Sequence, residues 1–565
     1  MSSRVSISTV VEVIGVVALL LIARFLVWAV HLFVIAPRLD PLRHLPGPDG
    51  SAMQNHFREV MDPNLSQDTH ERWVKQYGRT FRFHGFGKHD YRLMSLDFRA
   101  VSHVLNSPVY EKPWQTRRLL ARLLGRGISV MEGDEHRPRS VARKIIAPAF
   151  STQSVKALCP IFLQVAEELR DIWDNQISQS ASTTEPKNPG LSAVMDSYNW
   201  ISRATFDIIG LAGFDYPFRS LEDESEEVSL AYRKMFAATD KGPGLKGLLR
   251  LYFPIIERVL PDEAAWITKQ SLRTIRAAGD KLIANKKAAI MASASSSKEI
   301  RDKDLLSLLI KSNLSENPAQ RMSDDVLLDQ LSTFLFAGSD STAVSIAWCL
   351  HNLAIHQDIQ ARLRYEIMSL TAIASVSHPE HTGSETTRSP SYADAVDALP
   401  FLDGVVRETL RLSPPVHGTI RVATADDHIP LSQGTILRDG TATTHIRIKK
   451  GSYVHIPIEG LNTSTDVWGD DARQFNPDRW LRPLPSHPGL ASLMTFSYGP
   501  HSCPGWKFSL LEAKVFLAVL LPSFKFSPAD DISKFNAILT RPYVKGKFEL
   551  GTQLPVRVER YEEAC

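Results

Sequence analysis

The feature that most constrains this chain is one cysteine enclosed by glycine and proline near the C-terminal end. Residues 496–505 read FSYGPHSCPG, and an apolar helical run from Phe508 to Leu520 follows the cysteine, Cys503. The start of a helix carries partial positive charge and unpaired N–H groups, and a bound metal cation deprotonates a thiol outright. Both effects favour a thiolate at Cys503.

The residues around this thiol suit a flat ligand. Gly499 and Gly505 let the backbone come close to such a ligand, and the ring of Phe496 can pack against its face. A thiolate, a glycine-lined loop and an aromatic ring together predict a haem whose iron is ligated by Cys503. The alternative is a purely structural residue, because a lone cysteine is most often a small buried hydrophobic side chain.

The loop follows the spacing Phe-x-x-Gly-x-His-x-Cys-x-Gly, which is far more specific than a lone cysteine. This spacing resembles the haem-binding signature of the cytochrome P450 family. The family usually has arginine at the place of His501, so this residue is a departure. His501 can still donate to a haem propionate, with a charge that depends on pH near neutrality.

Composition excludes several other classes of protein. The chain has 565 residues, 22% of them charged, and a net charge of only +3, which argues against nucleic acid as a partner. The four cysteines are widely scattered without a CxxC pair, so we expect a reducing compartment and neither a disulfide framework nor a zinc site. No linker divides the middle of the chain, and we therefore expect one catalytic domain over residues 41–565.

An apolar run near the N-terminus predicts a membrane anchor within residues 1–40. Val13 to Ala36 is broken only by Arg24 and His31, and as a helix it would span about 36 Å, enough for a hydrocarbon core of about 30 Å. A cleaved signal peptide is the alternative, but the run is too long and no small-residue cleavage site follows. The proline-rich segment 41–48 ends the helix, like the hinge of microsomal members of the family that this chain resembles.

Basic residues flank the anchor, with a modest excess on its C-terminal side at Arg38 and Arg43. This distribution favours a cytoplasmic catalytic domain. Together with the resemblance it implies a single-pass protein of the endoplasmic reticulum membrane. We accordingly expect the glycosylation sequons at Asn64, Asn313 and Asn462 to be unused.

The remaining patterns predict a mainly α fold with small β-sheets, which is the cytochrome P450 fold that the resemblance implies. Alternation typical of strands occurs at 80–96, near 417–420 and at 444–455. Most of the rest is typical of helices.

A long helix is predicted between Met322 and Leu350. Ser323 suits its N-cap, and leucines recur every four residues from Leu327. The helix contains the segment 337–342, AGSDST, in which a glycine costs about 1 kcal/mol relative to alanine and a buried acid needs partners. Two unfavourable choices side by side indicate a function.

This segment resembles the oxygen-binding helix of the same family, in which small residues leave a groove over the haem. The resemblance implies that Asp340 and the adjacent Ser341, usually threonine, relay protons to bound dioxygen, and Thr342 could supplement them. The alternative is that Asp340 and Ser341 cap a local break in the helix or face solvent.

Glu408-x-x-Arg411 places an acid and a base on one face of a helix that ends before Ser413. Alone this spacing means little, because such surface pairs are common. The later segment FNPDRW offers Arg479, and the resemblance implies a buried Glu–Arg–Arg network of Glu408, Arg411 and Arg479 with a structural role beneath the haem.

Two further arginines match family positions that often pair with a haem propionate. Arg421 lies in the extended segment after the prolines, and Arg143, or its neighbour Arg139, lies on a basic helix that begins near His136. The tryptophan of the family's Trp-x-x-x-Arg helix is absent, and the spacing to Phe150 is longer than usual. The alternative for Arg143 is a solvated basic face.

The resemblance implies a haem-thiolate monooxygenase that inserts one oxygen atom of O2 into a hydrophobic small molecule of terpenoid, sterol, fatty acid or polyketide type. The overall look resembles fungal members that tailor secondary metabolites. The sequence shows no nucleotide-binding glycine loop, so we expect electrons from a separate NADPH-dependent cytochrome P450 reductase, with Lys507 and Lys514 as part of its docking patch. The segments 107–130 and 237–260 are expected to shape the substrate pocket.

Two other functions stay open at this point. Some relatives rearrange or dehydrate substrates without consuming oxygen and often lack the acid–hydroxyl pair that Asp340 and Ser341 provide here. The chain could also be a haem-binding protein without turnover.

Overall fold

The computed structural model describes residues 7–50, 55–133, 136–183, 192–240, 263–294, 304–313, 323–376, 391–485 and 489–562. They form two compact units, each made of two stretches of sequence. The smaller unit contains residues 1–111 and 419–457, and the larger unit contains residues 112–418 and 458–565. The pocket segment expected at 237–260 lies largely outside the described residues.

The smaller unit begins with a long apolar helical stretch. Its elements are α1 (Ile7–Val30), the π-helical turn η1 (His31–Ile35) and α2 (Ala36–Leu39). From Gly15 to Leu39 the mean hydropathy is 2.4 and no part is buried, so this stretch is long and apolar enough to cross a membrane. It ends at Asp40, whose side chain accepts from Leu42 N at the start of the 3-10 turn η2 (Pro41–His44).

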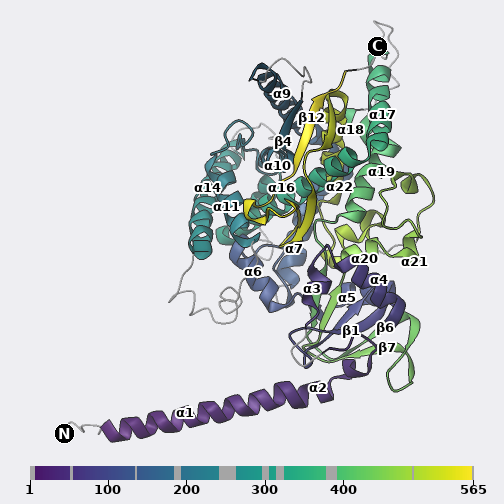
Figure 1. Ribbon diagram of the computed structural model, residues 1–565. Helices are drawn as coiled ribbons and strands as arrows, with labels where there is room; N and C mark the ends of the chain where they lie inside the picture. The colour runs from purple at the N-terminus through teal and green to yellow at the C-terminus, as the bar shows by residue number, and fades with distance from the viewer. Residues whose placement is uncertain are drawn as a thin grey trace, which may run out of the picture. The chain divides into compact units, whose positions relative to one another are not determined.

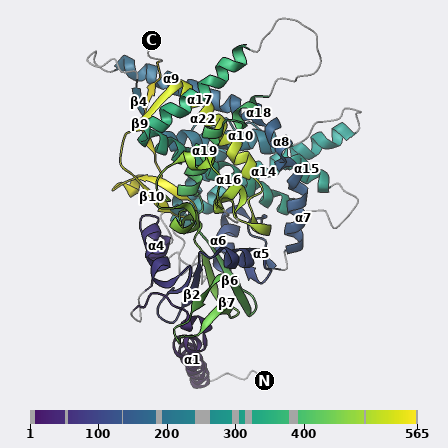
Figure 2. The ribbon, with the colours of Figure 1, turned by 90° about the vertical axis from the view of Figure 1, so that its right-hand side faces the viewer.

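A five-stranded sheet forms the body of the smaller unit, in the order β1-β2-β8-β5-β3. Only β2 and β8 are parallel, and in Figures 1 and 2 purple N-terminal elements lie beside green strands from far along the chain. After η2, the elements of the unit, including the five strands of this sheet, are α3 (Phe57–Met61), α4 (Ser66–Tyr77), β1 (Thr80–His84), β2 (Tyr91–Ser95), α5 (Phe98–Asn106), β3 (Tyr110–Glu111), β5 (Thr419–Ala423), β6 (Asp427–Ile436), β7 (Ala442–Ile448) and β8 (Tyr453–Ile456). All three strand regions expected from alternation are present, although β5 begins two residues later than 417.

The larger unit is mostly helical. Before the central helix it contains α6 (Trp114–Leu124), α7 (His136–Ile146), η4 (Ala147–Phe150), α8 (Thr152–Ala157), α9 (Cys159–Thr183), β4 (Ser192–Asp196), α10 (Ser197–Phe214), α11 (Glu227–Asp240), α14 (Glu263–Ala294) and α15 (Leu305–Asn313). After it come α17 (Gln357–Val376), α18 (Tyr392–Asp397), α19 (Pro400–Leu412), α20 (Ile458–Asn462), α21 (Thr465–Trp468) and α22 (Trp506–Ser523). Short 3-10 turns, η6 (Pro477–Leu481), η7 (Leu490–Ser492), η8 (Met494–Phe496) and η9 (Gly499–His501), carry the chain from α21 to α22.

The central helix is α16 (Asp324–Ile355), against which α10, α14, α19 and α22 pack most extensively (Figures 1 and 2). Ser323 caps it as predicted, because its hydroxyl accepts from Val326 N at 3.3 Å. Most of its side chains from Leu327 to Ala354 are buried. Burial on nearly all sides is typical of a helix that crosses a core.

Two small sheets complete the larger unit, and periodicity did not predict them. The strands β4, β12 (Pro555–Arg560) and β9 (Phe524–Pro528) form an antiparallel sheet, and β10 (Ile532–Asn536) pairs with β11 (Thr540–Val544) as a hairpin. These strands have six residues or fewer, too short for alternation to stand out. The fold is therefore mainly helical with small sheets, as predicted.

Glu512 on α22 generates a testable prediction. Its side chain is fully buried, and in the described part of the chain neither carboxylate oxygen has a hydrogen-bond partner. Burial holds the pKa of Glu512 well above its usual range. Folding therefore favours the protonated form, so the associated stability is fully present below about pH 4.3 and is lost as pH rises through the folded pKa.

We expect Glu512→Gln to unfold at a higher temperature than the parent at pH 8, with a smaller difference at pH 5. The glutamine has the same shape but no charge to bury. Thermal unfolding of both proteins from pH 5 to pH 8 measures this difference. A parallel pH dependence in the two proteins would contradict it.

Candidate active site

The Cys503 loop connects the turn η8 to helix α22. Cys503 N donates to Phe496 O at 2.8 Å, which closes the loop on itself. Gly499 and Ser497 have positive φ values of 64° and 60°. The backbone thus turns sharply twice before the cysteine, and at Gly499 a residue without a Cβ takes this conformation at no steric cost.

The thiol of Cys503 lies just before the N-terminus of α22, whose N-cap is Gly505. Burial raises the pKa of Cys503, while the Gly505 N–H and the nearby Arg143 act in the opposite direction. The expected help from the helix start is therefore outweighed by burial. A bound metal cation would favour the thiolate.

Arg143 lies on α7, the basic helix predicted from His136. One of its terminal nitrogens donates to Ser502 O at 2.8 Å, so the guanidinium holds the loop beside the cysteine. This contact excludes the alternative of a purely solvated basic face. A contact with a propionate stays a prediction, and the side chain of Arg139 is outside the described residues.

His501 lies next to a buried acid that no sequence motif singled out. Its Nδ1 is 3.7 Å from Oε1 of Glu132, which is also 3.4 Å from Lys112 Nζ. The structure thus places a carboxylate where the departure from arginine occurs. The predicted contact between His501 and a propionate is not tested by this arrangement.

Most of helix α16 is buried, but one face of it is accessible at Ala337 and Ser341. Ala337 is exposed and Ser341 is half-buried, whereas their neighbours Asp340 and Thr342 are buried. Ser341 Oγ donates to Ala337 O at 2.7 Å. Thr342 Oγ1 donates to Oγ of Ser509 on α22 at 3.2 Å, so it ties α16 to the helix that follows Cys503.

Gly338 has a different role from the groove that the family resemblance suggested. A Cβ at this position would lie 2.6 Å from Cδ1 of Ile209 on α10, which is closer than side chains tolerate. The glycine is needed so that α10 can pack against α16. The small residue on the open face is Ala337.

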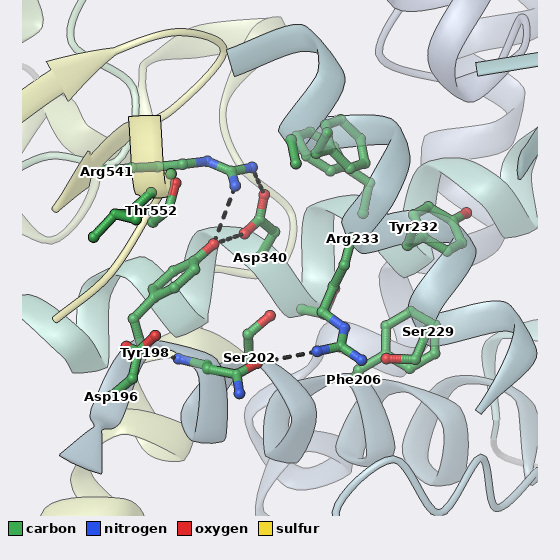
Figure 3. A pocket seen from close by; sticks show the side chains of 17 residues that line it. Asp196, Tyr198, Ser202, Phe206, Ser229, Tyr232, Arg233, Asp340, Arg541 and Thr552 are labelled. Atoms are coloured by element: carbon green, nitrogen blue, oxygen red, sulfur yellow. Dashed lines mark hydrogen bonds and ion pairs between the residues drawn. The ribbon is translucent and has the colours of Figure 1, made fainter. Parts of the chain in front are cut away.

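Asp340 is held by two partners that sequence reasoning missed. Its carboxylate accepts from the hydroxyl of Tyr198 at 2.8 Å and forms an ion pair with Arg541, which comes from β11. These side chains line a cavity of about 220 Å3 (Figure 3). The alternatives of a local break or a solvent-facing acid are wrong, because α16 continues through Asp340 and the side chain is buried.

Glu408, Arg411 and Arg479 meet in the core of the larger unit. Both oxygens of Glu408 accept from Arg411 at 2.8 Å, and Arg479 Nε donates to the same carboxylate at 2.9 Å. Trp480 Nε1 and Asn476 N each add a hydrogen bond at 3.0 Å. Glu408 and Arg411 are fully buried, so this is a desolvated charge network rather than a surface pair.

The network reaches the Cys503 loop through Asn462. Arg411 donates to Asn462 O at 2.9 Å, while the side-chain amide of Asn462 binds Thr495 Oγ1 and Met494 N just before Phe496. Asn462 is fully buried with both side-chain amide atoms engaged, so its sequon cannot carry a glycan in the folded chain.

Two further residues for which the sequence predicted a role are Lys514 and Arg421. Lys514 is buried between Asp397 and Asp403, at 2.8 and 2.7 Å, so its expected place in a docking patch is wrong. Arg421 belongs to the smaller unit, where it lies on β5 and donates to Thr419 Oγ1 at 2.6 Å. Its predicted propionate contact stays a prediction.

Comparison with known proteins places these motifs in a family. The cytochrome P450 family model matches residues 46–548 of this chain. The chain belongs to the cytochrome P450 family. This match includes the Cys503 loop, the α16 segment and the Glu408 network of the P450 fold.

Curated relatives match over nearly their whole length. Cytochrome P450 monooxygenase 128 of Postia placenta is 35% identical over 95% of this chain and 97% of its own. Cytochrome P450 monooxygenase claP of Ampulloclitocybe clavipes is 31% identical over 93% and 94%. Ganoderic acid synthetase CYP5150L8 of Ganoderma lucidum is 30% identical over 89% and 91%. All three relatives are fungal proteins, two of them named P450 monooxygenases, and the chain is accordingly an oxidoreductase.

The P450 family implies a haem-thiolate cofactor, and the described residues fit it. Cys503 is a lone soft donor, and the described part of the chain holds no group of three or more His, Cys, Asp or Glu side chains that could bind a bare metal ion. Ala337 and Ser341 on α16 have small, accessible side chains that would leave room for a flat group. Cys503 would hold the iron, and Arg143 would steady the loop that carries it.

The Glu408 network generates a second prediction. Glu408→Ala leaves two buried guanidinium groups without their carboxylate, and we expect it to cost about 3–5 kcal/mol of unfolding free energy. Denaturant unfolding of the full chain in detergent measures this loss.

The matched control is Glu71→Ala, which removes the carboxylate of an exposed i,i+4 pair with Lys75 and should cost less than about 1 kcal/mol. Equal losses in the two variants would show that the buried network contributes no more to the free energy of unfolding than the exposed pair does.

Proposed function

We propose that this chain is a haem-thiolate monooxygenase that inserts one oxygen atom from O2 into a hydrophobic small molecule, in fungal secondary metabolism. The observation that carries the proposal is the half-buried Cys503 loop, which Arg143 and the Glu408 network hold in place. The relatives named monooxygenases support the reaction class. The relative named for ganoderic acid supports a biosynthetic role with a natural product of terpenoid, sterol, fatty acid or polyketide type.

When bound, the haem would supply the oxidising chemistry, and Cys503 is the residue that would hold its iron. The protein supplies orientation and protons. Ser341 places its hydroxyl on the open face of α16, and Asp340 lies one residue before it as the acid of the relay. Thr342 keeps α16 in register with α22 through Ser509. Phe496 packs beneath the loop, where its ring lies near that of Trp506.

Electrons are proposed to come from a membrane-bound NADPH–cytochrome P450 reductase, so that NADPH is used indirectly. Lys507 offers one cation near the cysteine helix: its Nζ is 5.4 Å from the centre of the Trp506 ring and donates to Thr152 Oγ1. We further propose a single-pass protein of the endoplasmic reticulum membrane, with residues 1–40 as the anchor and residues 41–565 as the cytoplasmic catalytic domain. The apolar stretch Gly15–Leu39 supports this placement.

The ligation test is spectroscopic. The reduced protein treated with carbon monoxide should show the red-shifted Soret band of thiolate-ligated haem, and Cys503→Ser should lose it. Cys349→Ser is the control, because Cys349 is another free cysteine and is buried on α16, outside the Cys503 loop. A band that survives in Cys503→Ser would overturn the proposal.

The reaction class is tested by turnover. Lipophilic compounds that shift the Soret band should give oxygenated products only with NADPH, reductase and O2 together. Products formed without NADPH and O2 would instead identify an isomerase or dehydratase. Spectral binding without any product from the compounds that bind would favour a non-catalytic haem protein.

The anchor gives a further prediction. Deletion of residues 1–39 removes the apolar stretch, so we expect the shortened chain to move from the membrane pellet to the supernatant while keeping the carbon monoxide band. Fractionation of expressing cells measures this, with the full chain as control. A truncated chain that stays wholly in the pellet with a normal band would show that another surface holds the protein on the membrane.

A further inference from the structure

The carboxylate of Asp340 is engaged at both oxygens. Oδ1 accepts from the Tyr198 hydroxyl at 2.8 Å, Oδ2 pairs with Arg541, and the second terminal nitrogen of Arg541 is 3.2 Å from the same hydroxyl. The three side chains form a closed triangle in Figure 3, which we call the Asp340 clamp. They come from α16, α10 and β11.

The clamp holds a charged group in a desolvated place. The side chains of Asp340 and Arg541 are only 12% and 6% exposed. A buried carboxylate needs such a partner, because removal of one member of a buried ion pair leaves an uncompensated charge. Arg541 supplies that partner for Asp340.

The clamp also turns Asp340 away from Ser341. The Ser341 hydroxyl donates to Ala337 O, and within the described residues the carboxylate of Asp340 bonds to Tyr198 and Arg541. In this arrangement no hydrogen bond joins the acid to the adjacent hydroxyl in the described chain. Passage of a proton between them requires Asp340 to leave the clamp.

On its other side the clamp faces the cavity of about 220 Å3. Polar side chains line part of it, among them Asp196, Asn199, Ser202 and Thr552, whereas the guanidinium of Arg233 is engaged by Asn199 and Glu224. Its volume is enough for several water molecules, since one occupies about 30 Å3 in the liquid. The polar lining gives such waters the partners that they need.

We propose that Arg541 and Tyr198 are positioning residues that hold Asp340 toward this cavity and thereby control proton delivery to Ser341. The inference rests on the proposed monooxygenase function. One turnover consumes one O2, a pair of electrons from the reductase and a pair of protons from water; one oxygen atom enters the substrate and the other leaves as water.

Each proton takes the same two steps. A proton from bulk solvent passes along the cavity waters: the water next to Asp340 gives a proton to the carboxylate while it accepts one from the water behind it. One O–H bond breaks and one forms at each transfer, and no hydroxide is left. Neutral Asp340 loses its attraction to Arg541, turns to Ser341 and gives its proton to the hydroxyl oxygen, whose own proton moves on to the reacting oxygen.

The test needs no identified substrate. The full chain and reductase in lipid vesicles reduce O2 with NADPH alone, either to peroxide, with one NADPH per O2, or to water, with a second NADPH and twice the protons. We expect Arg541→Gln and Tyr198→Phe to shift the products toward peroxide and to raise the solvent deuterium isotope effect. Water formation in Arg541→Gln should slow by about tenfold or more, as for a disabled proton-transfer group. Arg541→Lys, which keeps the charge, should recover much of the loss.

Two matched controls line the same cavity. Tyr232→Phe removes a buried hydroxyl that donates to Ser332 O, and Arg233→Gln removes a guanidinium that binds Glu224. Both should keep the parental product ratio and isotope effect. Unfolding supplies a readout without turnover: Asp340→Asn and Arg541→Gln should be non-additive, whereas Asp340→Asn and Arg233→Gln should add.

The outcomes separate the two proposals. A parent chain without the carbon monoxide band overturns the monooxygenase function itself. A normal band together with parental ratios and isotope effects in Arg541→Gln and Tyr198→Phe overturns only the clamp. If Arg541→Gln does not take up haem, the product ratio and isotope effect of Tyr198→Phe decide whether the clamp proposal holds. This variant removes a single oxygen atom and so disturbs the fold least.

Discussion

The site depends on one buried charge, the carboxylate of Glu408. Taking a carboxylate and two guanidinium groups out of water is costly, and only near-complete hydrogen bonding offsets that cost. Here Arg411, Arg479, Trp480 and a backbone amide all converge on the two oxygens. The network therefore has one geometry, which fixes the positions of the residues that are hydrogen-bonded to it.

The Cys503 loop is the main segment that this network holds in position. From Arg411 the hydrogen bonds continue to Asn462 and Thr495, and Thr495 donates back to Leu410 O on α19 at 2.7 Å. The next residue, Phe496, accepts from the amide of Cys503. Since cysteine ligation tolerates little displacement, the rigidity of this path matters more than the free energy of any bond in it.

Sequence reasoning worked where spacing along the chain carries the information. The loop of Cys503, the cap at Ser323 and the helical pair Glu408–Arg411 are local patterns, and the structure places them as expected. Tyr198, Arg541 and Glu132 were missed, because each meets its partner across a long stretch of chain and has no motif around it. Gly338 was singled out for its low helix propensity, but the reason for a glycine at this position, the side chain of Ile209, lies on another helix. Lys514 was misjudged for the same reason, since its acids come from α18 and α19.

The contact between Gly338 and Ile209 ties together two positions that lie far apart in the chain. A larger residue at 338 would favour a smaller one at 209, because a Cβ at 338 would overlap the side chain of Ile209. These positions should therefore covary among relatives. Libraries that diversify α16 to alter which compounds are oxidised would recover more folded members by randomising 209 at the same time.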